Sequence, residues 1–341
     1  MGAELGSPQI IADIDQAVAA LTGLRKVAVS LHGEPRLPSS SEELPGTNSN
    51  NSLNSLTVSE LSKKYRDDKS FLERRFNTRG HYLTVIKQIE TEIGPRKIAD
   101  LTVEDIQALY DGWVATRGAS MAHGMIGIFR IMIYFGANTL RDPHCERVSV
   151  ILHRMRFSQP KSTAEKLTSA QADAIRTAAR KLNRPSIALA QALQSDLDLS
   201  QIDVIGTWVP DTEPGDSDIH YAGNKWLYGL RWEGIDDKFV LRHVTSKQGV
   251  EVVIDLQSSE RVVEELRLAQ GGDGPLQRDK FPATGPVVWC ESTDLPWTPA
   301  EFRRYWRKAA TIAGVPSTVK NGASRGSTSS DKEDGRADVR H

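Results

Sequence analysis

Between Thr57 and about Phe157, apolar residues recur at three- and four-residue spacing, which is the period of α-helices that bury one face. Thr102 and Asp105 form the pattern of an N-cap and its capping partner at the start of one such helix. The stretch 121–135 is almost wholly apolar, so the sequence predicts that it is the buried central helix of a compact bundle. Nothing in this bundle suggests catalysis.

A second region, which contains both helix and strand patterns, begins at Thr168. Thr168 and Gln171 form another capping box. Pro185 fits the first turn of a helix that is predicted to run to Leu199. Further along the chain, Thr298 has the features of an N-cap. The helices predicted after residue 240 are 258–268 and 298–313, with a Gly/Pro-rich loop at 271–285 between them.

Two β-strands are predicted within this mixed region. The β-branched and aromatic runs Phe239–Val244 and Val250–Ile254 have strand composition, and turn-forming residues lie between them. The two strands therefore form a hairpin, with Lys247 raised at its tip.

Polar stretches flank and separate the two patterned regions. Residues 1–56 form a tail, with one amphipathic stretch at 10–24 and a Ser/Asn-rich linker at 38–55 that cannot bury enough apolar surface to fold. Residues 157–168 are a plausible connection between two domains. Residues 326–341 contain almost no apolar side chains and are predicted to be a disordered tail.

Composition narrows the class of protein. A chain of 341 residues with 39% hydrophobic content can bury a sizeable core. Two cysteines are too few for a disulfide framework, no apolar run is long enough for a membrane span, and the N-terminus lacks signal-peptide features. We therefore expect a cytoplasmic protein. His144, Cys145 and His153 lack paired-ligand spacing, so no metal site is predicted.

Charge is distributed unevenly, although the net charge is only −1. Residues 57–166 carry 18 basic and 13 acidic side chains, a net charge of +5. Residues 301–325 carry six basic residues and one acidic residue. Clusters of this kind are typical of surfaces that contact nucleic-acid phosphates, and also of solvated helix faces.

Several segments, taken in order, resemble the tyrosine recombinases of the phage-integrase type. They are NTRGHYLTVIKQIETEIG in the bundle, then RPSIALAQALQSDLDLSQIDVIGTWVP, KWLYGLRWEGID, RHVTSKQG, and LPWTPAEFRRYWRKAATIAGVP ahead of Ser324-Arg325. The resemblance covers roughly residues 59–325. It implies a mainly α protein with a helical, SAM-like core-binding domain at 57–160 that clamps DNA. It also implies a mostly helical integrase-type catalytic domain with a small antiparallel β-sheet at 168–325, incomplete at its C-terminal end.

The chemistry of that family implies roles for particular residues. A tyrosine attacks the scissile phosphodiester, two arginines clamp the phosphate oxygens, and a hairpin lysine protonates the leaving oxygen, without metal or cofactor. Lys247 matches the hairpin lysine and Arg325 the second arginine. Asp203 matches the acidic residue three places after the first arginine, but Ser200 stands at that arginine's own position.

The resemblance is incomplete beyond these residues. Gly322 stands where the family has a histidine before the second arginine, and His341 is at best an uncertain match to the later histidine. No tyrosine follows Arg325, while Tyr305 and Tyr228 do not have the family position. We therefore expect that the chain as written binds DNA but is catalytically inactive.

The resemblance also implies double-stranded DNA as the partner, with self-association on DNA and no membrane or small-molecule cofactor. The basic residues proposed as DNA contacts outside the catalytic set are Lys63, Lys64, Arg79, Arg96, Arg303, Arg304, Arg307 and Lys308. Two alternatives remain open. One is an active integrase cut short by a frameshift, and the other is a helical interaction module without a DNA role.

Overall fold

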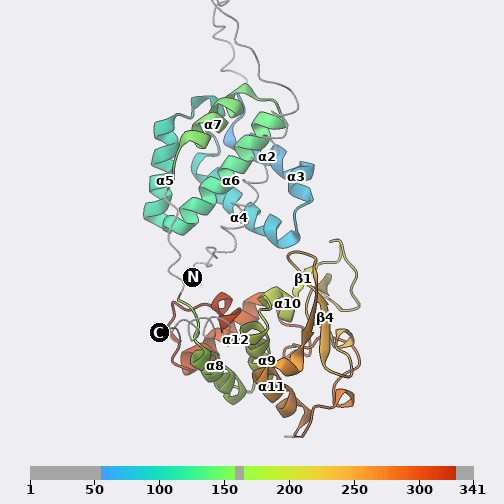
Figure 1. The fold of residues 1–341 in the computed structure, drawn as a ribbon. Helices are drawn as coiled ribbons and strands as arrows, with labels where there is room; N and C mark the ends of the chain where they lie inside the picture. The colour runs from blue at the N-terminus through green and yellow to red at the C-terminus, as the bar shows by residue number, and fades with distance from the viewer. Residues whose placement is uncertain (1–54, 158–164, 273, 328–341) are drawn as a thin grey trace, which may run out of the picture. The chain divides into compact units, whose positions relative to one another are not determined.

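The computed structural model describes residues 55–157, 165–272 and 274–327, and the chain divides into two compact units between Ser162 and Thr163 (Figure 1). That boundary falls within the connection predicted at 157–168. The amphipathic stretch at 10–24, nearly all of the linker at 38–55, residues 328–341 of the predicted tail and the candidate His341 lie outside the described residues.

Unit 1 is an all-helical bundle around α6, which runs over Ala119–Asn138. Twelve residues of α6 are buried, and α2, α4, α5 and α7 all pack against it. The prediction of a buried central helix is confirmed. The surrounding elements are α2 (Val58–Arg66), α3 (Lys69–Leu72), α4 (Phe76–Ile93), η1 (Ile98–Asp100), α5 (Val103–Arg117) and α7 (Pro143–Arg154).

Side-chain caps define several helix starts in unit 1. The Thr102 hydroxyl accepts a hydrogen bond from the Asp105 backbone N–H, and the Asp105 carboxylate accepts one from the Thr102 N–H, as the sequence predicts. Among the described residues, α6 is a helix long and apolar enough to cross a membrane, but 61% of that apolar window is buried inside the protein. The bundle around it accounts for its apolar composition.

Unit 2 is built on α9 (Pro185–Asp196), in which ten of the twelve residues are buried. Helices α8 (Ser169–Lys181), α11 (Glu260–Gln270) and α12 (Pro299–Ile312) pack around it. The predicted helix to Leu199 ends earlier, at Asp196, because Asp198 takes the left-handed conformation with φ 54° and turns the chain. A separate short helix, α10 (Gln201–Ile205), then begins.

Unit 2 contains two small antiparallel sheets rather than one. The predicted hairpin is confirmed as β4 (Val240–Val244) and β5 (Glu251–Asp255). The other sheet has the order β1-β3-β2 and was not predicted as a sheet. Its strands are β1 (Thr207–Pro210), β2 (His220–Tyr221) and β3 (Asn224–Leu227). The remaining described elements are η2 (Trp232–Gly234), η3 (Leu256–Ser258), η4 (Arg278–Lys280) and η5 (Asn321–Ser324).

A glycine fixes the position of α10 against this second sheet. Gly206 ends α10 with φ 72°, and a Cβ there would lie 2.2 Å from Nε1 of Trp226. The Trp226 indole in turn donates a hydrogen bond to the Ile205 carbonyl at 2.9 Å. Only glycine allows this close approach, so α10 and β3 are held in one arrangement.

Candidate functional site

The start of α10 is the structural centre of the residues singled out in the sequence. Ser200 is the N-cap of α10, and its hydroxyl accepts a hydrogen bond from the Asp203 N–H at 3.3 Å. The same hydroxyl donates to Oδ2 of Asp203 at 2.6 Å. Ser200 therefore stabilises the helix start and orients the Asp203 carboxylate.

Asp203 is a buried anchor. Its Oδ1 accepts a hydrogen bond from the Ser246 backbone N–H at 2.6 Å and lies 3.3 Å from Nε2 of His243. Burial alone would raise the pKa of Asp203, but the hydrogen bonds from His243, Ser200 and Ser246 outweigh it and hold that pKa well below its usual range. The group is therefore a carboxylate at physiological pH, and it ties the hairpin to α10.

The hairpin turn carries Lys247 next to this anchor. The Thr245 N–H donates to the Val250 carbonyl at 2.8 Å, and the Gly249 N–H donates to the Thr245 carbonyl at 2.9 Å. Gly249 has φ 66°, which this turn requires. Lys247 is exposed on the turn, directly after the residue whose N–H binds Asp203.

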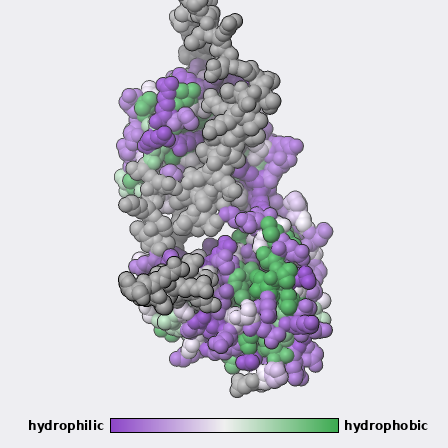
Figure 2. Space-filling view, viewed as in Figure 1, coloured by the Kyte–Doolittle hydropathy of each residue, from purple (hydrophilic) through white to green (hydrophobic). Residues whose placement is uncertain are grey.

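The surface of the hairpin is mixed, with Arg242, Glu251 and Asp255 exposed beside apolar side chains. Figure 2 shows apolar surface on the part of unit 2 where β4 lies in Figure 1. Val244, Val250 and Val253 of the hairpin are all more than half exposed. The hairpin that carries Lys247 thus exposes both apolar and charged side chains.

Arg325, near the C-terminal end of the described chain, contacts the residue two positions before the N-cap of α10. Its Nε donates to the carbonyl of Asp198 at 3.0 Å and to Oδ1 of Asp198 at 3.1 Å, while Nη2 lies 3.3 Å from Oδ2. The backbone beside it is fixed, since the Gly326 N–H donates to the Gln194 carbonyl at 2.9 Å. The Ser324 hydroxyl also donates to Oε1 of the buried Gln191.

The hairpin and the Arg325 segment are therefore both attached to the short stretch 198–203. We call this stretch and the side chains of Lys247 and Arg325 the α10 corner. Ser200 and Asp203 belong to it, Arg325 is bonded to Asp198 within it, and Lys247 follows the residue whose N–H binds Asp203. Within the corner, Arg325 forms an ion pair with Asp198, and the Asp203 carboxylate is bound by Ser200, His243 and the Ser246 N–H.

Two contributors to the corner were missed in the sequence. Asp198 pairs with a residue 127 positions away, and no local pattern indicates such a contact. His243 was quoted in the hairpin segment but given no role. The strand alternation placed it on the inward face of β4, which was the available signal.

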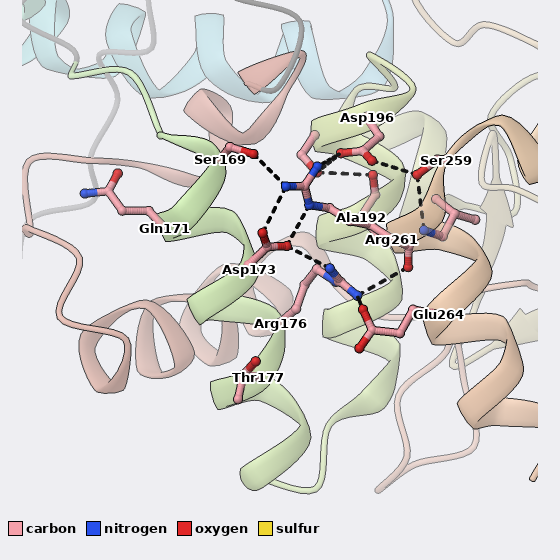
Figure 3. Close-up of polar contacts among 12 residues, drawn as sticks. Ser169, Gln171, Asp173, Arg176, Thr177, Ala192, Asp196, Ser259, Arg261 and Glu264 are labelled. Carbon is pink, nitrogen blue, oxygen red and sulfur yellow. Dashed lines mark hydrogen bonds and ion pairs between the residues drawn. The ribbon is translucent and has the colours of Figure 1, made fainter. Parts of the chain in front are cut away.

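An ion-pair network joins the helices that precede the corner (Figure 3). Asp196, at the end of α9, accepts a hydrogen bond from the Ser259 hydroxyl at 2.7 Å, and Arg261 lies 3.5 Å from its Oδ1. Arg261 also makes two hydrogen bonds to Asp173 of α8, at 2.6 and 2.9 Å. These contacts join α8, α9 and α11 at Asp196, which lies two residues before Asp198 in the chain.

The same network continues into the core. Arg176 of α8 is 3% exposed and contacts Asp173, Glu264 and Glu265. Glu265 is equally buried, and burial raises its pKa despite these partners. The network is part of the scaffold of unit 2 rather than of a surface site.

Three of the four basic residues of α12 are exposed, and the fourth is hydrogen-bonded to backbone carbonyls. Arg303, Arg304 and Lys308 are exposed, with Arg304 3.4 Å from Glu301. Arg307 is only partly exposed, and its guanidinium donates to the carbonyls of Pro316 and Val319. Arg307 therefore holds the segment after α12 in place.

The four candidates in unit 1 divide in the same way. Lys63 and Lys64 are exposed in the last turn of α2. Arg79 donates to the carbonyls of Leu72 and Arg74 at 3.0 and 2.6 Å, and Arg96 pairs with Asp105 at 2.9 Å. Arg79 and Arg96 thus have structural partners within the bundle.

Of the two alternative tyrosines, Tyr305 lies away from the corner. The ring of Tyr305 is half-buried beneath Arg184, whose Cζ lies 4.8 Å from the ring centroid. Arg184 precedes the first residue of α9, whereas the corner follows its last residue, about 18 Å away along a 12-residue helix. Tyr228 is 43% exposed in an unusual backbone conformation, with φ 71°.

No metal-binding arrangement is present in the described part of the chain. No group of three or more His, Cys, Asp or Glu residues there is placed to hold an ion. Cys145 is buried in unit 1, and burial raises its pKa to about 12. A thiol with such a pKa is a poor metal ligand.

The chain matches no family model and shows no significant match to a curated protein. It is similar to solved structures of two integrases. A lambda integrase dimer bound to a COC' core site has a TM-score of 0.55 and 17% identity, with 78% of this chain and 66% of that chain covered. The matched region is thus just under two thirds of that lambda integrase chain.

Two further structures extend the comparison. A shorter lambda integrase fragment, also a dimer on a COC' core site, has a TM-score of 0.57 and 15% identity, with 80% of this chain and 88% of that chain covered. The Tn1549 transposon integrase with circular intermediate DNA has a TM-score of 0.51 and 12% identity, with 82% and 88% covered. These structures confirm that the chain has the mainly α fold that its resemblance to integrases predicts.

Proposed function

We propose that this chain is a duplex-DNA-binding protein of the tyrosine recombinase type, and that Lys247 and Arg325 contact a DNA backbone phosphate at the α10 corner. The observation that carries this proposal is the attachment of both their segments to the stretch 198–203. The solved structures of similar fold, which are integrases bound to DNA, support DNA as the ligand.

The chemistry of the corner suits a phosphate. Arginine offers a planar fork of N–H donors that remains charged, and lysine offers a compact charge with rotatable donors. Both side chains are exposed, so a phosphate can approach them from solvent. Binding of this kind requires no metal or nucleotide.

We further propose that the corner does not cleave DNA efficiently. Ser200 has no charge to offer, and its hydroxyl is already engaged with both the backbone and the carboxylate of Asp203. Loss of one preorganised donor to a transition state costs about 3 kcal/mol, or about a hundredfold or more in rate. A DNA-binding role without efficient strand cleavage follows.

Five exposed residues extend the proposed DNA contacts beyond the corner. They are Lys63, Lys64, Arg303, Arg304 and Lys308. Arg79, Arg96 and Arg307 have partners within the protein, and their contact with DNA stays a prediction. Lambda integrase is a dimer on a COC' core site and a tetramer on a Holliday junction, which supports the proposal that copies of this chain associate on DNA. The cytoplasmic location stays a prediction.

Duplex DNA binding measured over a series of salt concentrations tests this function. We expect the logarithm of affinity to fall linearly with the logarithm of salt concentration, because phosphate contacts release counterions. A protein with no salt-dependent affinity would instead be a helical interaction module.

Cleavage is tested separately with a suicide substrate that traps covalent protein–DNA adducts. We expect no adduct with the native chain. Recovery of a phosphotyrosyl adduct would contradict the proposed loss of cleavage, while leaving DNA binding intact.

A further inference from the structure

The guanidinium of Arg325 is held by a carboxylate. Asp198 approaches it with Oδ1 3.1 Å from Nε and Oδ2 3.3 Å from Nη2, so that two carboxylate oxygens meet one edge of the fork. A phosphate presents two oxygens to arginine in the same manner. Asp198 thus has the chemistry of a phosphate substitute on the side chain proposed to bind phosphate.

This ion pair is accessible and weak. The side chains of Arg325 and Asp198 are 48% and 62% exposed. Exposed ion pairs of this kind stabilise a protein little, because water and salt screen the charges and the side chains lose freedom. The contact can therefore give way to a ligand with more negative charge.

The backbone at Asp198 is also unusual. Asp198 has φ 54°, a region that non-glycine residues seldom adopt, although aspartate and asparagine tolerate it better than most. This conformation turns the chain between α9 and α10, beside Arg325. A backbone outlier at a candidate ligand site justifies a functional hypothesis.

The two carboxylates of the corner are not equivalent. Asp203 is 4% exposed, and its oxygens are engaged by Ser200, His243 and the Ser246 N–H. Its negative charge is fixed and turned inward. Asp198 is exposed and faces Arg325, so its charge directly opposes an incoming phosphate.

We propose that the Asp198 carboxylate competes with DNA phosphate for Arg325 and so sets the affinity of the α10 corner. Before DNA binds, Asp198 neutralises the guanidinium. A bound phosphate takes over the two donors and leaves the carboxylate to water. This inference rests on the proposed function, since it requires that Arg325 contact DNA.

The test is duplex DNA binding by Asp198→Asn at several salt concentrations. Asparagine keeps the shape of the side chain and tolerates the same backbone region, but it removes the competing charge. From the usual strength of exposed ion pairs, we expect binding about two- to fivefold tighter than that of the native chain at low salt. The gain should shrink as salt increases.

Asp294→Asn is the matched control. Asp294 is exposed in unit 2, has φ 55° and undergoes the same change in charge. Arg325→Gln, alone and with Asp198→Asn, completes a double-mutant cycle. The gain from Asp198→Asn should disappear when Arg325 is replaced, and thermal unfolding of each variant checks that the fold is intact.

The outcomes separate the two proposals. If the native chain shows no salt-dependent binding, the proposed function fails and this inference fails with it. If the native chain binds but Asp198→Asn binds no tighter than Asp294→Asn, or binds more weakly, Asp198 does not compete and the inference alone is overturned. A gain that persists in the Arg325→Gln background would also overturn it.

Discussion

At the scale of single residues, the α10 corner shows how one serine can serve the fold in place of a charged group. Ser200 caps α10 and holds the Asp203 carboxylate. Asp203 then binds the hairpin through Ser246 and His243. The corner is therefore well ordered even though it lacks the first arginine that the resemblance implied.

Replacing Asp203 by asparagine tests this anchor through pH. At pH 7 the variant loses hydrogen bonds to a buried carboxylate, and we expect a loss of about 2 kcal/mol in unfolding free energy. The folded-state pKa of Asp203 lies below its ordinary value of 3.8, so its stabilisation is present above that value and is lost as the pH falls further. The difference between native and variant should therefore narrow below about pH 4.

Urea unfolding between pH 7 and pH 3 measures this difference. Asp216→Asn, at an exposed position in unit 2, is the control and should change little at any pH. A stability difference for Asp203→Asn that stays constant down to pH 3 would contradict the account.

Some of these residues could be predicted from the sequence and others could not. Lys247 was predictable because strand and turn composition are local signals. Asp198 was not, since its partner lies 127 positions away in the chain, and for His243 strand alternation indicated the inward face but not the partner 40 positions away. For Arg79, Arg96 and Arg307 the sequence reveals the charge but not the intramolecular partners that engage it.

At the scale of elements, caps and apolar periodicity predicted the helices of unit 1 well. They did not predict the end of α9 at Asp196, because an aspartate rather than a glycine makes the turn to α10. They also missed the β1-β3-β2 sheet, whose strands have two to four residues and are interrupted by the polar run 211–218. Strands that short carry too little alternation to be recognised.

The network among α8, α9 and α11 is expected to dominate the stability of unit 2. Arg176 is almost fully buried among carboxylates, so Arg176→Ala leaves Glu265 buried with fewer partners. Breaking a buried pair in this way costs about 3–5 kcal/mol. Urea unfolding measures the loss.

Arg180→Ala is the comparison, because Arg180 contacts the same two glutamates but its side chain is 28% exposed. We expect a loss of about 1 kcal/mol there. Equal losses for the two variants would mean that burial of Arg176 does not govern the strength of the network.

At the scale of the whole molecule, two helical units each present exposed cations, and unit 2 adds a corner where cations and carboxylates meet. The fold class was predictable from several segments in a fixed order, and the similar integrase structures agree with it. The arrangement of charges at the corner was not predictable, since it depends on contacts between segments far apart in the chain.

A double-mutant cycle between Lys247 and Arg325 tests the central claim most directly. Duplex DNA affinity is measured at one low salt concentration for Lys247→Gln, Arg325→Gln and the double variant, with Lys280→Gln as an exposed control in unit 2. If both side chains contact one phosphate, the two losses will be coupled by more than about 0.5 kcal/mol. Losses that simply add, or that match the Lys280→Gln control, would contradict convergence on a shared phosphate.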